Sequence, residues 1–244
     1  MTHPLPTRRD EAWRYSDLVA LADVWPLPAA ERIALAPGET ATRTIIETGE
    51  GVVVRALAIT LAAGARVDLH ILNSGARFGR IAVDVTLGRG AEFNLGGVQI
   101  GGDSQTLEIV TVVTHAEPEA VSRQTVRSVL GGHATGTYLG KVAVARDAQK
   151  TDSAQSVRAM LLDRTATANA KPELEIFADD VKCAHGCAVG ELDARGLFYL
   201  ASRGLPPPQA KALMLHAFVA EAFTDAGDRE ALEEAAFAAL ETLL

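Results

Sequence analysis

Two cysteines and one histidine have the types and spacing best suited to metal chemistry in this sequence. Cys183, His185 and Cys187 occupy alternate positions near the end of the segment 177–187. Side chains at alternate positions of an extended strand point to the same face, so these three would line one surface. Two thiolates and an imidazole suit zinc, iron or part of an iron–sulfur cluster, but three ligands leave the coordination shell incomplete. A further ligand would have to come from elsewhere, for example from another chain.

Other interpretations of the same segment remain open. Cys183 and Cys187 can be small buried hydrophobic residues, with His185 a hydrogen-bonded surface residue, because C-x-H-x-C is not a specific zinc pattern. A Cys–His nucleophilic pair is another alternative, but no orienting group and no oxyanion hole can be identified for it. The carboxylates Asp179 and Asp180 would face opposite sides of a strand, so they do not form an acid–base pair by themselves.

Composition and charge exclude several classes of function. The 244 residues are 48% hydrophobic and 22% charged, which is typical of a soluble globular protein, and 23 basic against 31 acidic residues give a net charge of −8. This acidic balance disfavours a general nucleic-acid-binding role. The N-terminus lacks the apolar region of a signal peptide, and no stretch is apolar enough to span a membrane. We therefore expect a cytoplasmic protein that does not bind membranes.

Other sites find little support in the sequence. Neither a dinucleotide-binding glycine motif nor a P-loop occurs, so we expect no nucleotide site. Two cysteines are too few for a stabilising framework of disulfides. The remaining histidines that we considered, and expect to be structural or solvated, are His70, His115, His133 and His216.

The elements that must position Cys183, His185 and Cys187 follow from the residue pattern. Residues 38–190 form short runs of alternating apolar and polar residues, rich in Val, Ile and Thr and broken by Gly, which predicts strands without intervening helices. A repeat is also visible. The run 61–69 realigns with 87–95 at a shift of 26 residues, and a weaker copy lies at 144–152. This repeat favours a parallel β-helix over an antiparallel sandwich or barrel, so we expect a mainly β fold.

Different patterns flank this β-helix core. Residues 1–37 form a mixed N-terminal segment, with a short amphipathic piece over 9–18 followed by prolines. Residues 191–244 have helical periodicity, and the first helix is predicted to start at an N-cap, Asp193. The predicted helices cover 193–202, about 209–224, and 228 to the C-terminus. We expect this helical domain to seal the open end of the solenoid and to offer a surface to a partner.

Long runs around the two cysteines carry a resemblance to a known family. They are Lys171 to Gly186 (KPELEIFADDVKCAHG), Val189-Gly190 and 197–205 (LFYLASRGL), with 140–142, 148–155, 161–162 and Trp13 to Ser16 (WRYS) upstream. Together they resemble the SufB/SufD family of iron–sulfur cluster assembly proteins, and specifically its SufD branch, over most of the chain. The resemblance implies a right-handed parallel β-helix with a C-terminal helical domain.

The resemblance also implies a role, partners and site residues. The chain would be a non-catalytic scaffold subunit of the SUF pathway that pairs with SufB and binds the ATPase SufC through its C-terminal helices. A transient iron–sulfur cluster would be built at the SufB interface, with His185 and the neighbouring Cys183 at that site, and the isolated chain would hold no cofactor. The same face would allow the isolated chain to form a homodimer. The side chains that dock SufC would be Phe198, Tyr199, Arg203, Leu213 and Phe218.

Two features depart from the family pattern. Cys187 stands where the family commonly has Ala, so it is either an extra ligand or a harmless small residue. Many SufD proteins carry a long helical region before the motif at 13–16, and we expect the segment 1–37 to lack most of it. Two other functions stay open: a stand-alone metal carrier that uses Cys183, His185 and Cys187, and a β-helix enzyme that acts on polysaccharides.

Overall fold

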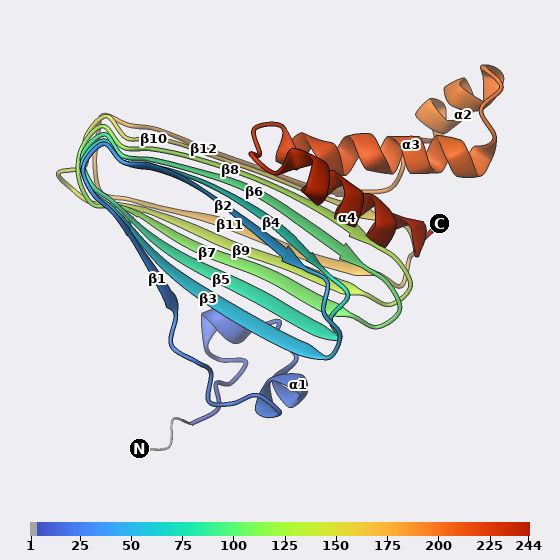
Figure 1. The fold of residues 1–244 in the computed structure, drawn as a ribbon, viewed down its shortest axis with the longest axis horizontal. Coiled ribbons are helices and arrows are strands. Elements are labelled where there is room, and N and C mark those ends of the chain that lie inside the picture. Colours follow the sequence, from blue (N-terminus) through green and yellow to red (C-terminus); the bar gives the residue numbers. More distant parts are fainter. Residues whose placement is uncertain (1–3) are drawn as a thin grey trace.

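The alternating runs form a two-sheet parallel β-solenoid in the computed structural model, which describes residues 4–244 (Figure 1). Sheet A contains, in spatial order, β1 (Glu31–Leu35), β3 (Val52–Leu61), β5 (Phe78–Leu87), β7 (Thr106–His115), β9 (Thr135–Val144) and β11 (Thr167–Ile176). Sheet B contains β12 (Lys182–Gly190), β10 (Asp152–Leu161), β8 (Val121–Leu130), β6 (Glu92–Gly101), β4 (Arg66–Ser74) and β2 (Thr40–Glu47). Neighbouring strands within each sheet pair in parallel throughout. The mainly β fold and the parallel β-helix are confirmed.

The solenoid begins earlier than the sequence predicted. Its first strand, β1, starts at Glu31, inside the segment 1–37 that was expected to precede the core. This five-residue strand has little alternation of its own and takes its regularity from pairing with β3, so local pattern did not reveal it. The last strand ends at Gly190, where the predicted core also ends.

The registers explain which copies of the repeat were visible. Paired residues are 26 positions apart between β3 and β5 and between β4 and β6, so Leu61 stacks on Leu87 as predicted. The offset then grows to 28, 29 and 32 residues from β5 through β7 and β9 to β11. His115 lies between Leu87 and Val144 in the same stack. The copy that starts at residue 144 is therefore two coils beyond the copy at 87–95.

Inward-facing side chains of both sheets fill the narrow interior. In the first coils they are aliphatic: Leu61 and Leu87 of sheet A and Leu69 and Leu95 of sheet B are all buried in one continuous core. Burying each such side chain contributes about 1.5–3 kcal/mol relative to leaving it exposed. The apolar stack therefore holds successive coils together.

Three helices and a short 3₁₀ turn form the C-terminal part. They are α2 (Ala194–Ser202), α3 (Pro207–Ala220), η2 (Glu221–Phe223) and α4 (Arg229–Glu241). The predicted start of α2 is confirmed, because the Asp193 side chain accepts a hydrogen bond of 3.0 Å from the backbone N–H of Arg195. The next helix starts at Pro207, two residues before its predicted start, because proline is tolerated in the first turn of a helix.

The helical part covers a face of the solenoid, so the prediction that it seals the open end is wrong. Helices α3 and α4 lie along the outer face of sheet B, whereas α2 projects away from both sheets (Figure 1). The outer face of sheet B carries apolar side chains that need cover, and they pack against Leu215, Phe223 and Leu240. These outward side chains are Leu72, Val98, Ile100 and Val129.

The N-terminal segment packs on the outer face of sheet A. It contains η1 (Glu11–Trp13) and α1 (Leu18–Ala22), which lie within or beside the predicted amphipathic piece. The Asp17 side chain caps α1 by accepting hydrogen bonds from two backbone N–H groups. Ala20 and Leu21 pack with Phe78 of β5 in a small separate core. Among residues 4–244, no helix has the length and apolar character of a bilayer span.

Candidate functional site

The three candidate ligands lie on β12, which pairs with β10 on one side only and leaves its other edge free. Cys183 stacks on Ser153 of β10, and His185 stacks on Gln155. Ser153 and Gln155 are buried inside the solenoid, so the side chains above them face the same inner side at its open end. The prediction that Cys183, His185 and Cys187 share one face agrees with this register. His185 and Cys187 are exposed there, and Cys183 is half-buried.

These side chains do not make a complete metal site within one chain. Alternate residues of a strand are about 6.6 Å apart, too far for short side chains to converge without help. Across the described part of the chain, no group of three or more His, Cys, Asp or Glu side chains is placed to hold a metal ion. A metal ion bound at this edge would need ligands from a second chain.

The thiol of Cys183 is not activated by its surroundings. Burial raises its pKa, and the nearby carboxylate of Asp152 acts in the same direction. A thiol with a raised pKa is mostly protonated at neutral pH, whereas nucleophilic cysteines have lowered pKa values. This environment argues against the Cys–His nucleophilic pair.

The interior becomes polar directly beneath His185 and Cys183, whereas Val157 and Val126 keep it apolar beneath Cys187. From β4 onward, the stack that ends at His185 consists of Leu69, Leu95, Gln124 and Gln155, and it begins at Arg43 of β2. The stack that ends at Cys183 consists of Val67, Phe93, Ser122 and Ser153. Each stack changes from apolar to polar between β6 and β8. The last coils therefore place hydrogen-bonding groups where the first coils have a hydrocarbon core.

The stack below His185 is tied to sheet A by a buried network. The Gln155 Nε2 group donates to the hydroxyl oxygen of Tyr138 at 3.1 Å and to the carbonyl of Gly140 at 3.1 Å. The Tyr138 hydroxyl in turn donates to Gln124 Oε1 at 3.1 Å. Burial raises the pKa of Tyr138 to about 12, so the hydroxyl keeps its proton and its role as donor. The side chains beneath His185 are thus uncharged and hydrogen-bonded to one another.

A second buried chain of polar atoms leads toward Cys183. His115 Nε2 lies 2.9 Å from the Ser122 hydroxyl, which lies 2.9 Å from the Ser153 hydroxyl. Burial lowers the pKa of His115 to about 4, so its ring is neutral at physiological pH. From the sequence we expected His115 to be structural or solvated. Because it is fully buried, it is a structural residue of the interior. Aligning strand positions one coil apart would have revealed these serines and glutamines as one polar zone.

The surface predicted to dock a partner is largely exposed on α2. Phe198 is 76% exposed, Tyr199 is 56% exposed and Leu213 of α3 is 51% exposed. The guanidinium of Arg203 lies 5.2 Å from the centre of the Tyr199 ring. Phe218 differs from the prediction, because it packs half-buried against the chain's own helix–sheet core. Beside Phe198, a groove of about 480 Å³ runs between α2 and the start of α3.

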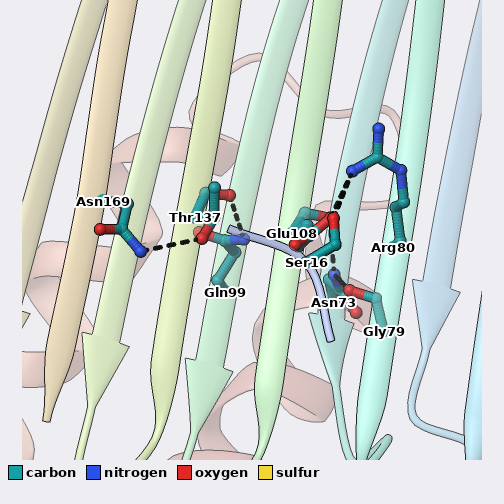
Figure 2. A network of polar contacts seen from close by, with 8 residues as sticks. All are labelled: Ser16, Asn73, Gly79, Arg80, Gln99, Glu108, Thr137 and Asn169. Atoms are coloured by element: carbon teal, nitrogen blue, oxygen red, sulfur yellow. Dashed lines mark hydrogen bonds and ion pairs between the residues drawn. The ribbon is translucent and has the colours of Figure 1, made fainter. Parts of the chain in front are cut away.

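The motif at 13–16 anchors the N-terminal segment on β5 and β7 of sheet A, where Ser16 lies beside Arg80 and Glu108 (Figure 2). Arg80 of β5 and Glu108 of β7 form an ion pair whose side chains are 3% and 1% exposed. Ser16 Oγ donates to the Glu108 carboxylate at 2.9 Å, and the Trp13 ring covers the Arg80 guanidinium at 3.8 Å. Burial raises the pKa of Glu108, against the opposing effect of Arg80. The motif therefore serves the packing of the chain.

Further polar side chains bridge the interior beside this ion pair. Asn73 of β4 donates through Nδ2 to the carbonyls of Gly79 and Glu108 at 3.0 and 3.1 Å (Figure 2). One coil on, Gln99 of β6 donates to the carbonyl of Thr137 at 3.0 Å. These hydrogen bonds join the two sheets inside the chain, so we interpret them as structural.

Comparison with known proteins gives a consistent family match. Residues 39–218 match the family model described as "SUF system FeS cluster assembly, SufBD core domain". The chain is 33% identical over 150 residues to the iron–sulfur cluster assembly protein SufD of Escherichia coli strain K12, an alignment that covers 56% of this chain and 35% of that protein. It is 31% identical over 189 residues to an iron–sulfur cluster assembly SufBD family protein of Synechocystis, which covers 75% and 42% of the two chains.

A plant relative shows the same partial coverage. Protein ABCI7, chloroplastic, of Arabidopsis thaliana is 33% identical over 171 residues, which covers 69% of this chain and 36% of that protein. The alignments therefore span between 35% and 42% of the length of these three curated relatives.

Proposed function

The chain belongs to the SufBD family of iron–sulfur cluster assembly proteins, and we propose that it is a non-catalytic, SufD-like scaffold whose β12 edge supplies part of a cluster site completed by a SufB-type chain. The observation that carries this proposal is the set of three candidate ligands on an edge strand that has one side unpaired. A second chain laid along that edge would bring its own side chains beside Cys183, His185 and Cys187. The edge thus provides both the binding surface and part of the ligand set.

The chemistry of these side chains suits a transient cluster as cargo. Thiolate and imidazole are established types of ligand for iron–sulfur clusters. The raised pKa of Cys183 means that metal binding must displace a proton, so affinity rises with pH. Such a site holds iron only when the partner's ligands are in place. The two free thiols also suit a reducing compartment such as the cytoplasm.

A second part of the proposal concerns the C-terminal helices. Exposed Phe198 and Tyr199 and the adjacent groove form an apolar patch suited to a protein partner, which we assign to the ATPase SufC. Only residues 191–193 separate the end of β12 from the start of α2. Movement of a bound ATPase can therefore be passed directly to the strand that carries the ligands.

Co-purification followed by cluster reconstitution tests this function. The chain should form a complex with SufB and SufC, and His185→Ala should lower cluster formation on that complex by about tenfold or more while the complex still assembles. His133→Ala is the matched control, because His133 is also exposed but lies in a turn away from β12. A chain that binds neither partner, or equal cluster formation by both variants, would contradict the proposal. Stoichiometric metal in the isolated chain would favour a stand-alone carrier.

A further inference from the structure

We propose that Gln155 is a positioning residue of the candidate cluster site, and that its side-chain oxygen accepts a hydrogen bond from the ring of His185. This bond leaves the other ring nitrogen of His185 as the atom that binds iron. The consequence for iron rests on the proposed scaffold function, whereas the hydrogen bond lies within one chain and is tested without any partner.

The orientation of the Gln155 amide is fixed by its two acceptors. Its Nε2 atom lies 3.1 Å from the carbonyl oxygen of Gly140 and 3.1 Å from the hydroxyl oxygen of Tyr138. A carbonyl oxygen can only accept, so the amide nitrogen and not the amide oxygen must lie toward Gly140. The Tyr138 hydroxyl gives its single proton to Gln124 Oε1, so it too accepts from Gln155. Both protons of the amide nitrogen are therefore used, and the amide oxygen is left over.

Close packing between Tyr138 and Gly140 holds these two acceptors in place. A Cβ atom at residue 140 would overlap the hydroxyl group and the ring of Tyr138, so only glycine admits the ring at this position. The Tyr138 side chain is also fully buried. The Gln155 amide thus binds a fixed pair of acceptors and cannot turn over without losing both hydrogen bonds.

The remaining atom, Gln155 Oε1, is buried and has no hydrogen-bond partner among the residues that the structure describes. A buried acceptor without a donor is costly, and native structures rarely leave one. The atoms below Gln155 in its stack belong to Gln124, whose Oε1 is itself an acceptor for Tyr138. We therefore infer that the donor comes from the layer above, which closes the solenoid.

The sheet A side of that closing layer offers no donor. Its inward residues are Ala170, Pro172 and Leu174 of β11, which stack on the inward residues of β9. Their side chains carry no polar atoms, and Pro172 has no backbone N–H group. The donor must therefore lie on β12.

On β12, His185 is the residue suited to this role. It stacks directly on Gln155, whereas Cys183 and Cys187 stack on the neighbouring positions. Thiols are weak donors, and the Cys187 thiol already lies 3.9 Å from the carbonyl oxygen of Ala170. His185 is exposed, so its ring has room to turn toward Gln155.

Such a hydrogen bond determines which nitrogen of His185 faces the partner. A neutral imidazole has one N–H group and one nitrogen with a free lone pair. When the N–H donates to Gln155 Oε1, the lone pair points away from the interior, where a second chain brings its own ligands. Histidines that bind metals almost always donate their other N–H to an oxygen acceptor, which fixes the tautomer and the ring orientation.

Nitrogen-15 spectra of the histidine rings test this contact in the isolated chain. At about pH 8.5 the ring of His185 is neutral, and a ring held in one tautomer gives two widely separated nitrogen shifts. We expect separated shifts in the wild type, and shifts that move toward each other in Gln155→Leu, because the two tautomers then interconvert. The variant His185→Gln identifies the signals by their loss.

A matched variant controls for the removal of a buried amide. Gln99 also bridges the interior, by donating to the carbonyl oxygen of Thr137 at 3.0 Å, but it lies in a different stack from His185. Gln99→Leu should therefore leave the His185 shifts separated. On the complex with SufB and SufC, Gln155→Leu should lower cluster formation by about tenfold, whereas Gln99→Leu should leave it unchanged. Circular dichroism melts show whether each variant is folded.

Three results would overturn the proposal. They are averaged His185 shifts in the wild type, separated shifts that persist in Gln155→Leu, and unchanged cluster formation by Gln155→Leu on a complex that loses it with His185→Ala. The first result is obtained on the wild type, so the test stands even if Gln155→Leu does not fold. Unchanged cluster formation by His185→Ala would instead contradict the scaffold function, and it would leave the ring shifts of the isolated chain as they are.

Discussion

The two ends of the solenoid are built from the same parallel coil but present different surfaces. At the first end, β1 is short, β2 carries charge, and Arg43 pairs with Glu31 across the coil at 2.9 Å. At the last end, β12 is nine residues long and carries one charge, at its first residue. Since the backbone is equivalent at both ends, the side chains decide which end can accept a second chain. We infer that the last end is the one kept open for assembly.

The interior of the solenoid also differs between the two ends, because two stacks of side chains change from apolar to polar along it. Leu69 and Leu95 are replaced by Gln124 and Gln155 in the same stack. A buried polar group is tolerated when it is hydrogen-bonded, but it contributes less to stability than an aliphatic one. The apolar first coils therefore contribute more to the stability of the fold than the last coils, whose polar side chains support Cys183 and His185.

The largest effect is expected from breaking the buried ion pair between the middle strands β5 and β7 of sheet A. Glu108→Ala leaves the Arg80 guanidinium buried without its partner, which should lower the free energy of unfolding by about 3–5 kcal/mol. Denaturant titration measures this loss. The double variant Arg80→Met/Glu108→Leu should recover most of the stability, since it removes both charges. A loss below about 1 kcal/mol for Glu108→Ala would show that the pair is not buried as described.

The next effect is a pH dependence that comes from the polar half. Burial lowers the pKa of His115 to about 4, against 6.5 for an ordinary histidine. The unfolded chain therefore binds more protons between these values, so stability is present above pH 6.5 and is lost as the pH falls toward 4, by about 3 kcal/mol.

Comparison with a variant isolates this histidine from the other titrating groups. The difference in unfolding free energy between wild type and His115→Gln should change across this pH window and be constant above it. Denaturant titrations at several pH values measure that difference. A difference that does not vary with pH would contradict the buried, neutral state of His115.

The smallest effect is expected at Gln155, which stacks directly beneath His185. Gln155→Leu replaces a hydrogen-bonded amide by a side chain of similar size, and it should change the free energy of unfolding by no more than about 1.5 kcal/mol. Leu69→Ala in the same stack should cost about 2–5 kcal/mol, because it opens a cavity in the apolar half. Parallel denaturant titrations compare the two. Equal losses of unfolding free energy in the two variants would contradict the distinction between the apolar first coils and the polar last coils.

Much of the fold could be predicted from local sequence, because the 26-residue offset is strict in the first coils. The later coils are longer, and His115 interrupts the apolar stack, so their register could not be derived from the repeat. The short strand β1 depends on its neighbour and carried no signal of its own. The positions of the helices along the chain were predictable from Asp193 and the periodicity. Their packing on sheet B was not, because it depends on Leu72 and Val98, which become neighbours only in the folded sheet.

The candidate site was predictable in part for the same reason. Alternation along one strand was enough to place Cys183, His185 and Cys187 on a single face. The serines and glutamines beneath them are about 30 residues away in the sequence and become neighbours only through the register of successive coils. Phe218 was assigned to a docking surface because the family resemblance implied that the C-terminal helices bind a partner, whereas α3 packs it half-buried against the chain's own core.

Hydrogen–deuterium exchange of the chain, alone and in complex with a SufB-type partner, tests the central claim most directly. The free edge of β12 leaves its outward amides open to exchange, and a strand paired along it would protect them. We predict that amides within Lys182–Gly190 slow down by at least about tenfold in the complex, while those of Glu31–Leu35 and Thr40–Glu47 keep their rates. Unchanged exchange in β12 within a stable complex, or protection of β1 and β2 in its place, would contradict it.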